Sequence, residues 1–271
     1  MKKYLLFVTV FLLTVALAAG CGKAPAQETT EPPVISTTEP SAEPVTEPST
    51  NAATEPTPTE TEEDVEYEGD ASSYYIDVVY PQQIDRYYAA ISQEWDREQY
   101  LENEMSSLVS HYYSGNALDN VGFTFMDLDG DGVWELIIGA IDNAQQNPLV
   151  FEIWALKNDE PVMIAQSGDH NRYYLQYSQE ENLWTVAYEA ENGAANHAVY
   201  YLQLVEGEFQ VIQGVVFDAM ANESAPWFMS YDLDWDVSND NSIDEETANA
   251  VMTAGRNLYT ATEYFPYCLY K

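Results

Sequence analysis

The sequence contains few basic residues. Nine lysines and arginines stand against 46 aspartates and glutamates, which gives a formal net charge of −37. A protein that binds nucleic acid needs a basic face to neutralise the phosphates. The charge therefore argues against nucleic acid as a partner, and it suits a soluble surface that attracts cations or basic proteins.

Cysteine, histidine and the common catalytic motifs are also scarce or absent. The chain has two cysteines and three histidines, and no histidine has a metal-ligand neighbour at helical or strand spacing. Gly-x-Ser-x-Gly, His-Glu-x-x-His and phosphate-binding glycine loops do not occur. The polar stretch from Ser167 to Arg172 is predicted to be a hairpin turn. Carboxylates are so numerous that no pair stands out as the acids of a glycoside hydrolase, so an enzyme is the less favoured interpretation.

Long apolar runs are missing apart from one at the N-terminus. Lys2 and Lys3 precede the apolar stretch from Tyr4 to Ala18, which is short for a spanning helix and ends in small residues directly before Cys21. This arrangement resembles a bacterial lipoprotein signal, although the leucine lies one position earlier than usual. The resemblance implies cleavage after residue 20, a lipid on Cys21, and an anchor in the outer face of a bacterial cell membrane. The alternative is an ordinary secretory signal.

The second cysteine, Cys268, is left without a partner if Cys21 carries lipid. It lies near aromatic residues and is predicted to be buried rather than reactive. The alternative is a disulfide between the two cysteines.

Residues 21–70 are predicted to be a disordered tether. They repeat Thr-Glu-Pro units, and from Glu28 to Asp70 they contain acidic but no basic residues. Such a segment buries too little apolar surface to order itself, while proline and like charge keep it extended. We expect a spacer between the membrane and a domain formed by residues 71–271; a proline-rich recognition motif or a glycosylated stalk is the alternative.

The domain is predicted to be α+β. Apolar residues fall at helical spacing over 82–113, which predicts one long helix or two. Short apolar or alternating runs separated by turn signals then predict an antiparallel β-meander. Ser242-Ile243-Asp244-Glu245 is predicted to be a capping box that opens a C-terminal helix through about residue 258. The predicted strands are 121–126, 134–141, 149–156, 161–166, 172–177, 183–188, 197–205 and 208–217.

The most informative motif is the acidic loop between the first two predicted strands. It reads Asp127-Leu-Asp129-Gly-Asp131-Gly-Val133-Trp-Glu135. Alternating carboxylates, glycines that permit positive φ, and the carbonyl of Val133 form an oxygen-rich ligand set suited to a hard cation, most plausibly calcium. A solvated acidic turn without an ion is the alternative.

This loop resembles the calcium loops of EF-hand-like and FG-GAP (integrin-type) modules. Ile138 stands where an EF-hand has its twelfth-position glutamate, and the acid lies at the ninth position, as in the strand-loop-strand version. The resemblance therefore implies structural calcium in a hairpin rather than a sensor that opens helices. The order of elements is also similar to surface lipoproteins of Gram-positive gut clostridia, a group that implies no particular reaction.

Two weaker sites are predicted near the C-terminus. Asp236, Ser238, Asp240 and Asp244 mimic a second calcium loop, although Thr247 stands where an EF-hand has glutamate. Trp227, Phe228 and Trp235 are considered as a stacking platform for a ligand, with core packing the favoured alternative.

These observations predict a membrane-anchored extracellular lipoprotein with a structural calcium loop. Its most plausible role is a non-catalytic module that binds a wall polymer, a glycan or a protein. The alternative is a secreted hydrolase with unidentified acidic catalytic residues. A solute-binding lipoprotein is disfavoured because the domain lacks the alternating strands and helices of two lobes.

Overall fold

The computed structural model describes residues 70–141 and 148–271. The predicted signal peptide, the lipidated Cys21 and the tether up to residue 69 lie outside the described residues. Within the described ranges no helix is long and apolar enough to cross a membrane.

The region predicted as a long helix is divided into short helical pieces, so that prediction was wrong. Asp96 begins a new helix with a capping box, in which Asp96 accepts from the Gln99 amide while the Gln99 side chain accepts from the Asp96 amide. Glu94, two residues before Asp96, has a positive φ of 49°, so the chain leaves the helical conformation after the preceding helix, α3 (Pro81–Ser92). The pieces, with their neighbours, are α2 (Ala71–Tyr74), η1 (Tyr75–Val79), α3 (Pro81–Ser92), α4 (Arg97–Glu102), η2 (Ser107–Tyr112) and α5 (Ala117–Asn120).

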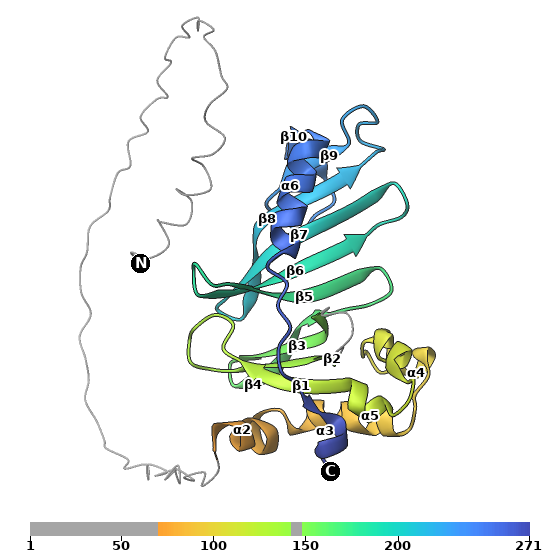
Figure 1. Ribbon diagram of the computed structural model, residues 1–271, viewed down its shortest axis with the longest axis vertical. Helices are drawn as coiled ribbons and strands as arrows, with labels where there is room; N and C mark the ends of the chain where they lie inside the picture. The colour runs from red at the N-terminus through yellow and green to blue at the C-terminus, as the bar shows by residue number, and fades with distance from the viewer. Residues whose placement is uncertain (1–69, 142–147) are drawn as a thin grey trace, which may run out of the picture. The chain divides into compact units, whose positions relative to one another are not determined.

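An antiparallel sheet of eleven strands forms the body of the domain, which confirms the α+β class and the meander (Figure 1). The strand order is β10-β9-β8-β7-β6-β5-β3-β2-β1-β11, and β4 pairs with β3 off this path. The strands are β1 (Val121–Met126), β2 (Glu135–Ala140), β3 (Leu149–Lys157), β4 (Glu160–Gln166), β5 (Asn171–Ser178), β6 (Leu183–Glu191), β7 (Asn196–Val205), β8 (Glu208–Asp218), β9 (Trp227–Ser230), β10 (Asn241–Ile243) and β11 (Phe265–Pro266).

Local turn chemistry explains why consecutive strands pair. Glu206 and Gly207 both have positive φ and connect β7 to β8, and Asn158 and Asp159 do the same between β3 and β4. Two successive residues with positive φ give a turn whose twist matches that of the strands. The tight turn predicted at residues 206–208 is therefore confirmed.

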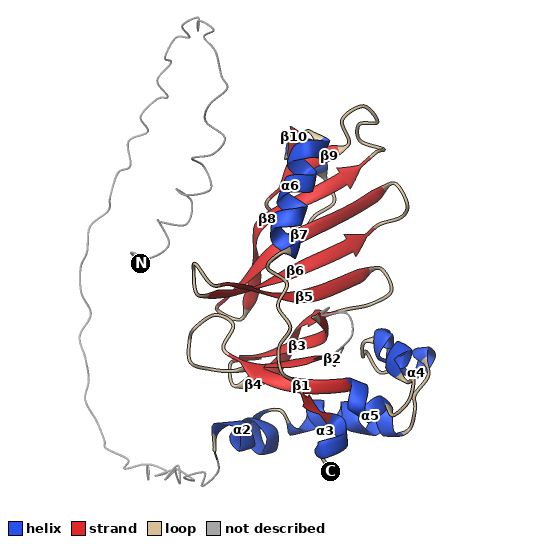
Figure 2. Cartoon of the chain, in the orientation of Figure 1, coloured by secondary structure: helices blue, strands red, loops and turns tan. Residues whose placement is uncertain are grey.

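The sheet buries side chains on both faces. Successive residues of a strand point to opposite faces, and Leu136 and Ile137 of β2 belong to two different apolar clusters. The first cluster includes the N-terminal helices through Ile84 and Tyr87, and the second is closed by loop residues such as Leu128. Figure 2 shows the helices gathered at two places, the N-terminal ones beside β1 and α6 beside the last long strands.

The C-terminal helix is α6 (Glu245–Arg256), as predicted in position but not in its cap. Asp244 is the N-cap and accepts from the Thr247 amide, whereas Ser242 belongs to β10 and pairs with Phe228. The capping box predicted to start at Ser242 was therefore wrong, because strand pairing takes that residue. Helix α6 packs against β8 and β9.

Candidate metal centre

The acidic loop closes the hairpin of β1 and β2. Met126 and Glu135 form the last residue pair of the two strands, so residues 127–134 project beyond the sheet. The carboxylates of Asp127, Asp129 and Glu135 offer oxygens that all lie within 4.8 Å of one another. Among the described residues, this is the group of acidic, histidine or cysteine side chains that is arranged to hold a metal ion.

Backbone hydrogen bonds fix the loop. Asp127 accepts from the amides of Gly130 and Gly132, at 2.7 and 3.1 Å, and Asp131 accepts from the Val133 amide at 2.7 Å. Gly130 and Gly132 have φ of 78° and 90°, a region that glycine occupies without steric cost. The sequence therefore folds locally into a turn that places the carboxylates of Asp127 and Asp129 close to that of Glu135.

Glu135 is the most unusual member of the group. Its side chain is 3% exposed, and one oxygen accepts from the Leu128 amide at 2.8 Å. Burial, followed by repulsion from Asp129, Asp131 and Asp127, raises the pKa of Glu135 to about 8. A carboxyl group in this position is costly to ionise unless a cation lies beside it.

The other carboxylates of the loop also have no basic side chain beside them among the described residues. Burial and repulsion from Asp131 raise the pKa of Asp129. The ion pairs formed within residues 70–141 and 148–271 all lie elsewhere and include none of the loop carboxylates. A hard divalent cation fits this donor set, because all its side-chain ligands are oxygens.

The structure brings together three of the five predicted ligands. Asp131 is exposed and outside the close group, although its charge acts on Asp129 and Glu135. Val133 is half-buried, and its amide supports Asp131. Asp127, Asp129 and Glu135 are therefore the residues that would hold the ion directly, with Asp131 adding charge beside them.

The loop has an aromatic support that the sequence analysis missed. Trp134 donates its amide hydrogen to the Tyr75 hydroxyl at 2.9 Å, and its carbonyl accepts from the Tyr80 hydroxyl at 3.0 Å. These tyrosines precede Trp134 by more than 50 residues, so no spacing pattern could have identified them. Their own helical segment joins the domain to the preceding chain.

The structure does not assemble the second predicted metal site as a group of ligands. Asp236 accepts from the Ser238 amide and caps the short helix η3 (Val237–Asn239), while Asp244 caps α6. Asp240 forms a hydrogen bond with the Ser230 side chain and lies near other carboxylates. Burial raises the pKa of Asp240. The aspartates thus serve as caps and turn residues, which is a common alternative use of this side chain.

The predicted aromatic platform is divided between the two faces of the sheet. Phe228 is 7% exposed and belongs to an apolar cluster against which Trp235 also packs. Trp227 points the other way and contacts Phe217 and His197, with ring centroids 4.8 and 5.8 Å away. The three residues do not share a surface, and core packing accounts for Phe228 and Trp235.

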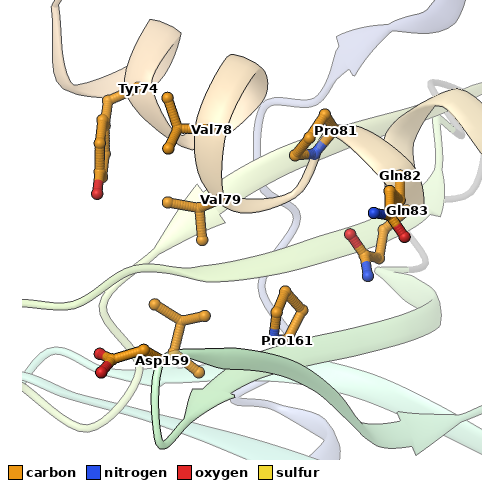
Figure 3. A pocket seen from close by; sticks show the side chains of 9 residues that line it. Tyr74, Val78, Val79, Pro81, Gln82, Gln83, Asp159 and Pro161 are labelled. Carbon is orange, nitrogen blue, oxygen red and sulfur yellow. The ribbon is translucent and has the colours of Figure 1, made fainter. Parts of the chain in front are cut away.

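A cavity of about 340 Å³ lies between the N-terminal helical segment and the β3–β4 hairpin (Figure 3). Its lining combines apolar and polar side chains, and Asp159 is the ionisable carboxylate among them. This cavity therefore does not present the pair of acids that the alternative hydrolase would need. Its lining residues are Tyr74, Val78, Val79, Pro81, Gln82, Gln83, Leu156, Asp159 and Pro161.

The structure also places two other features of the sequence, the polar stretch from Ser167 to Arg172 and Cys268. The stretch from Ser167 to Arg172 closes as a turn between β4 and β5, and Ser167 itself is buried and bonds to Val150 and Tyr173. Cys268 is a free, half-buried thiol rather than a fully buried one.

A buried glutamate outside the loop also escaped the sequence analysis. Glu152 is 0% exposed and accepts from the Ser106 amide, the Trp154 indole and the Gln166 amide, at 2.9 to 3.1 Å. Because its donors come from the helical layer as well as the sheet, it joins the two layers. Burial raises its pKa despite these donors.

Comparison with known proteins adds no relative. No family model, no curated protein and no solved structure matches this chain.

Proposed function

We propose that the acidic loop binds one calcium ion and that this ion is structural. The observation that carries the proposal is the buried carboxyl of Glu135, which lies with Asp127 and Asp129 and forms no ion pair with any basic side chain of residues 70–141 and 148–271. When bound, the ion supplies positive charge that offsets the repulsion among these groups. The chain contributes the carboxylate oxygens, two from the loop that connects β1 to β2 and one from Glu135 at the start of β2.

The affinity is expected to suit an extracellular protein. Calcium sites of extracellular modules have dissociation constants of about 10⁻⁴ to 10⁻³ M. Isothermal titration of the purified protein with calcium, and separately with magnesium, tests the proposal. Saturable calcium binding with one ion per chain is expected, with weaker magnesium binding because magnesium demands stricter octahedral geometry. Absence of saturable calcium binding would refute it.

We further propose that the chain is a lipid-anchored protein on the outer face of a bacterial membrane, and that its domain is a non-catalytic binding module. The apolar segment before Cys21 and the acidic tether support the anchor. A binding role is proposed ahead of hydrolysis because the sequence contains no Gly-x-Ser-x-Gly, no His-Glu-x-x-His and no phosphate-binding glycine loop. The ligand class is a wall polymer, a glycan or a protein.

Two measurements test this assignment. Metabolic labelling with a radioactive fatty acid should label the protein and should fail to label Cys21→Ala. A glycan array and a pull-down with purified cell walls, each with calcium or EDTA, should detect a retained ligand. Turnover of a glycan substrate without any retained ligand would instead favour the hydrolase.

A further inference from the structure

The metal loop is joined to the segment where the preceding chain enters the domain. Trp134 lies between Val133 and Glu135, and both its backbone polar groups bond to tyrosine hydroxyls from this segment. Tyr75 accepts from the Trp134 amide, and Tyr80 donates to the Trp134 carbonyl. The orientation of one peptide unit on each side of Trp134 is thereby set by residues of the entry segment, defined here as residues 71–80.

Ring packing strengthens the same connection. Tyr75 stacks on Trp134 with ring centroids 5.3 Å apart and planes 16° apart, and it also contacts Phe125 of β1 and Tyr80. Such aromatic pairs contribute beyond the apolar area that they bury. The contact therefore combines hydrogen bonds with packing at one residue of the loop.

The rest of the entry segment is attached less firmly. Neither α2 nor η1 contains a fully buried residue. Ile76 and Val79 pack partly against the core. Tyr74, Val78 and Val79 border the cavity that separates this segment from the β3–β4 hairpin (Figure 3). Few buried apolar contacts make a segment one of the first to open locally. Its docking therefore depends strongly on the contacts of Tyr75 and Tyr80.

We propose that cation binding at the loop locks the entry segment onto the domain, so that the loop controls how the chain leaves the domain toward its N-terminus. This inference rests on the calcium site proposed above. A bound cation holds Glu135 next to the aspartates and so fixes Trp134 for the two tyrosines. Without the cation, repulsion among the carboxylates loosens the loop, and the partners of Tyr75 and Tyr80 lose their fixed position.

The coupling acts in both directions. Because linked equilibria are reciprocal, the factor by which the cation strengthens docking of the entry segment is also the factor by which docking strengthens cation binding. A change that releases the entry segment therefore weakens cation binding by up to that factor. Tyr75→Phe removes the hydroxyl acceptor and keeps the ring. Since allosteric couplings commonly change affinity by about 5- to 150-fold, we expect Tyr75→Phe to lower calcium affinity roughly fivefold or more.

Hydrogen exchange followed by mass spectrometry, together with calcium titration, tests the inference on the purified protein. Calcium should slow exchange in residues 71–80, including the Tyr80 amide that bonds to the Tyr75 carbonyl. Peptides from β7 and β8 serve as an internal reference. Tyr88→Phe is the matched control, because Tyr88 lies on α3 and contacts Tyr270 rather than the loop; this variant should bind calcium like the wild type.

The outcomes separate the inference from the function on which it rests. Calcium binding without slower exchange in the entry segment, or with unchanged affinity in Tyr75→Phe, would overturn the inference and leave the calcium site standing. Absence of calcium binding in the wild type would overturn both. A loss of affinity in Tyr88→Phe equal to that in Tyr75→Phe would also overturn the inference, since the effect would then be general.

Discussion

Replacing Glu135 by glutamine is expected to stabilise the metal-free protein and to remove its response to calcium. Glutamine has nearly the same shape, and its carbonyl oxygen can still accept from the Leu128 amide. The substitution removes one negative charge from a group that is 3% exposed and surrounded by three aspartates. Without a cation, the negative charge of Glu135 destabilises the folded protein. With calcium present, the same carboxylate serves as a ligand.

The magnitude follows from the pKa of Glu135, which is raised from 4.5 to about 8. Below pH 4.5 the carboxyl is protonated in the folded and unfolded states, and the full stability is present. Between pH 4.5 and 8 the folded state keeps a proton that the unfolded state loses, so the free energy of unfolding falls as the pH rises. At about 1.36 kcal/mol per pKa unit the total loss above pH 8 is at most roughly 5 kcal/mol.

Thermal unfolding in EDTA across pH 5 to 9 measures this effect. Glu135→Gln should have a higher Tm than the wild type at pH 9, with a difference that shrinks toward pH 5. A free-energy change of 1 kcal/mol shifts Tm by roughly 2–4 °C in a domain of this size, so a difference of several degrees is expected. Calcium at about 100 times its dissociation constant should then stabilise the wild type by about 2.7 kcal/mol and the variant by little.

Two results would refute this reasoning. One is a variant that is no more stable than the wild type at pH 9 in EDTA, because the charge would then cost nothing. The other is an equal calcium-induced rise in Tm for both proteins, because Glu135 would then not be a ligand. Glu208→Gln is a suitable control, since that side chain is exposed and pairs with Lys157 far along the chain from the loop.

Further substitutions test other parts of the account. Asp131→Asn should lower calcium affinity less than Glu135→Gln does, because Asp131 is exposed and outside the close group. Parallel calorimetric titrations of the two variants test this, and an equal or larger loss for Asp131→Asn would contradict the ligand assignment. Glu152→Leu should lower the free energy of unfolding by roughly 3 kcal/mol or more in urea denaturation, because three donors lose their acceptor and each buried unsatisfied group costs about 1–3 kcal/mol. A change under about 1 kcal/mol would contradict this. Gly139→Ala should cost about 1–3 kcal/mol in the same assay, because a methyl group there overlaps the ring of the partly buried Tyr264. Unchanged stability would show that the ring moves aside freely.

Much of the sheet could be predicted because its signals are local. Each β-hairpin has its own turn residues, and the glycine at position 207 identifies a turn without knowledge of any distant contact. The calcium loop is equally local, since its proposed ligands fall within nine residues of sequence. Patterns of this kind depend on the period of the strand and on the conformational freedom of glycine.

The errors have a common physical cause. In each case, hydrogen bonding to the backbone gave a residue a different role from the one that its sequence pattern predicted. The Asp96 cap interrupts a stretch with continuous helical spacing, and pairing of Ser242 in β10 leaves Asp244 as the cap of α6. Asp236 and Asp244 of the second predicted metal site likewise cap helices, and that site stays a prediction.

Other features were beyond the sequence because they join distant positions. Tyr75 and Tyr80 meet Trp134 only when the entry segment lies beside β1 and β2. Nothing in the local sequence distinguishes them from the other tyrosines of an aromatic-rich domain. Glu152 is hidden for the same reason, since its donors come from three separate elements.

The central claim is tested most directly by the electron density of crystals grown with calcium. One strong, oxygen-coordinated peak is expected between Asp127, Asp129 and Glu135, and it should be absent from crystals of Glu135→Gln. Calcium-saturated crystals with no peak between these three side chains would contradict it.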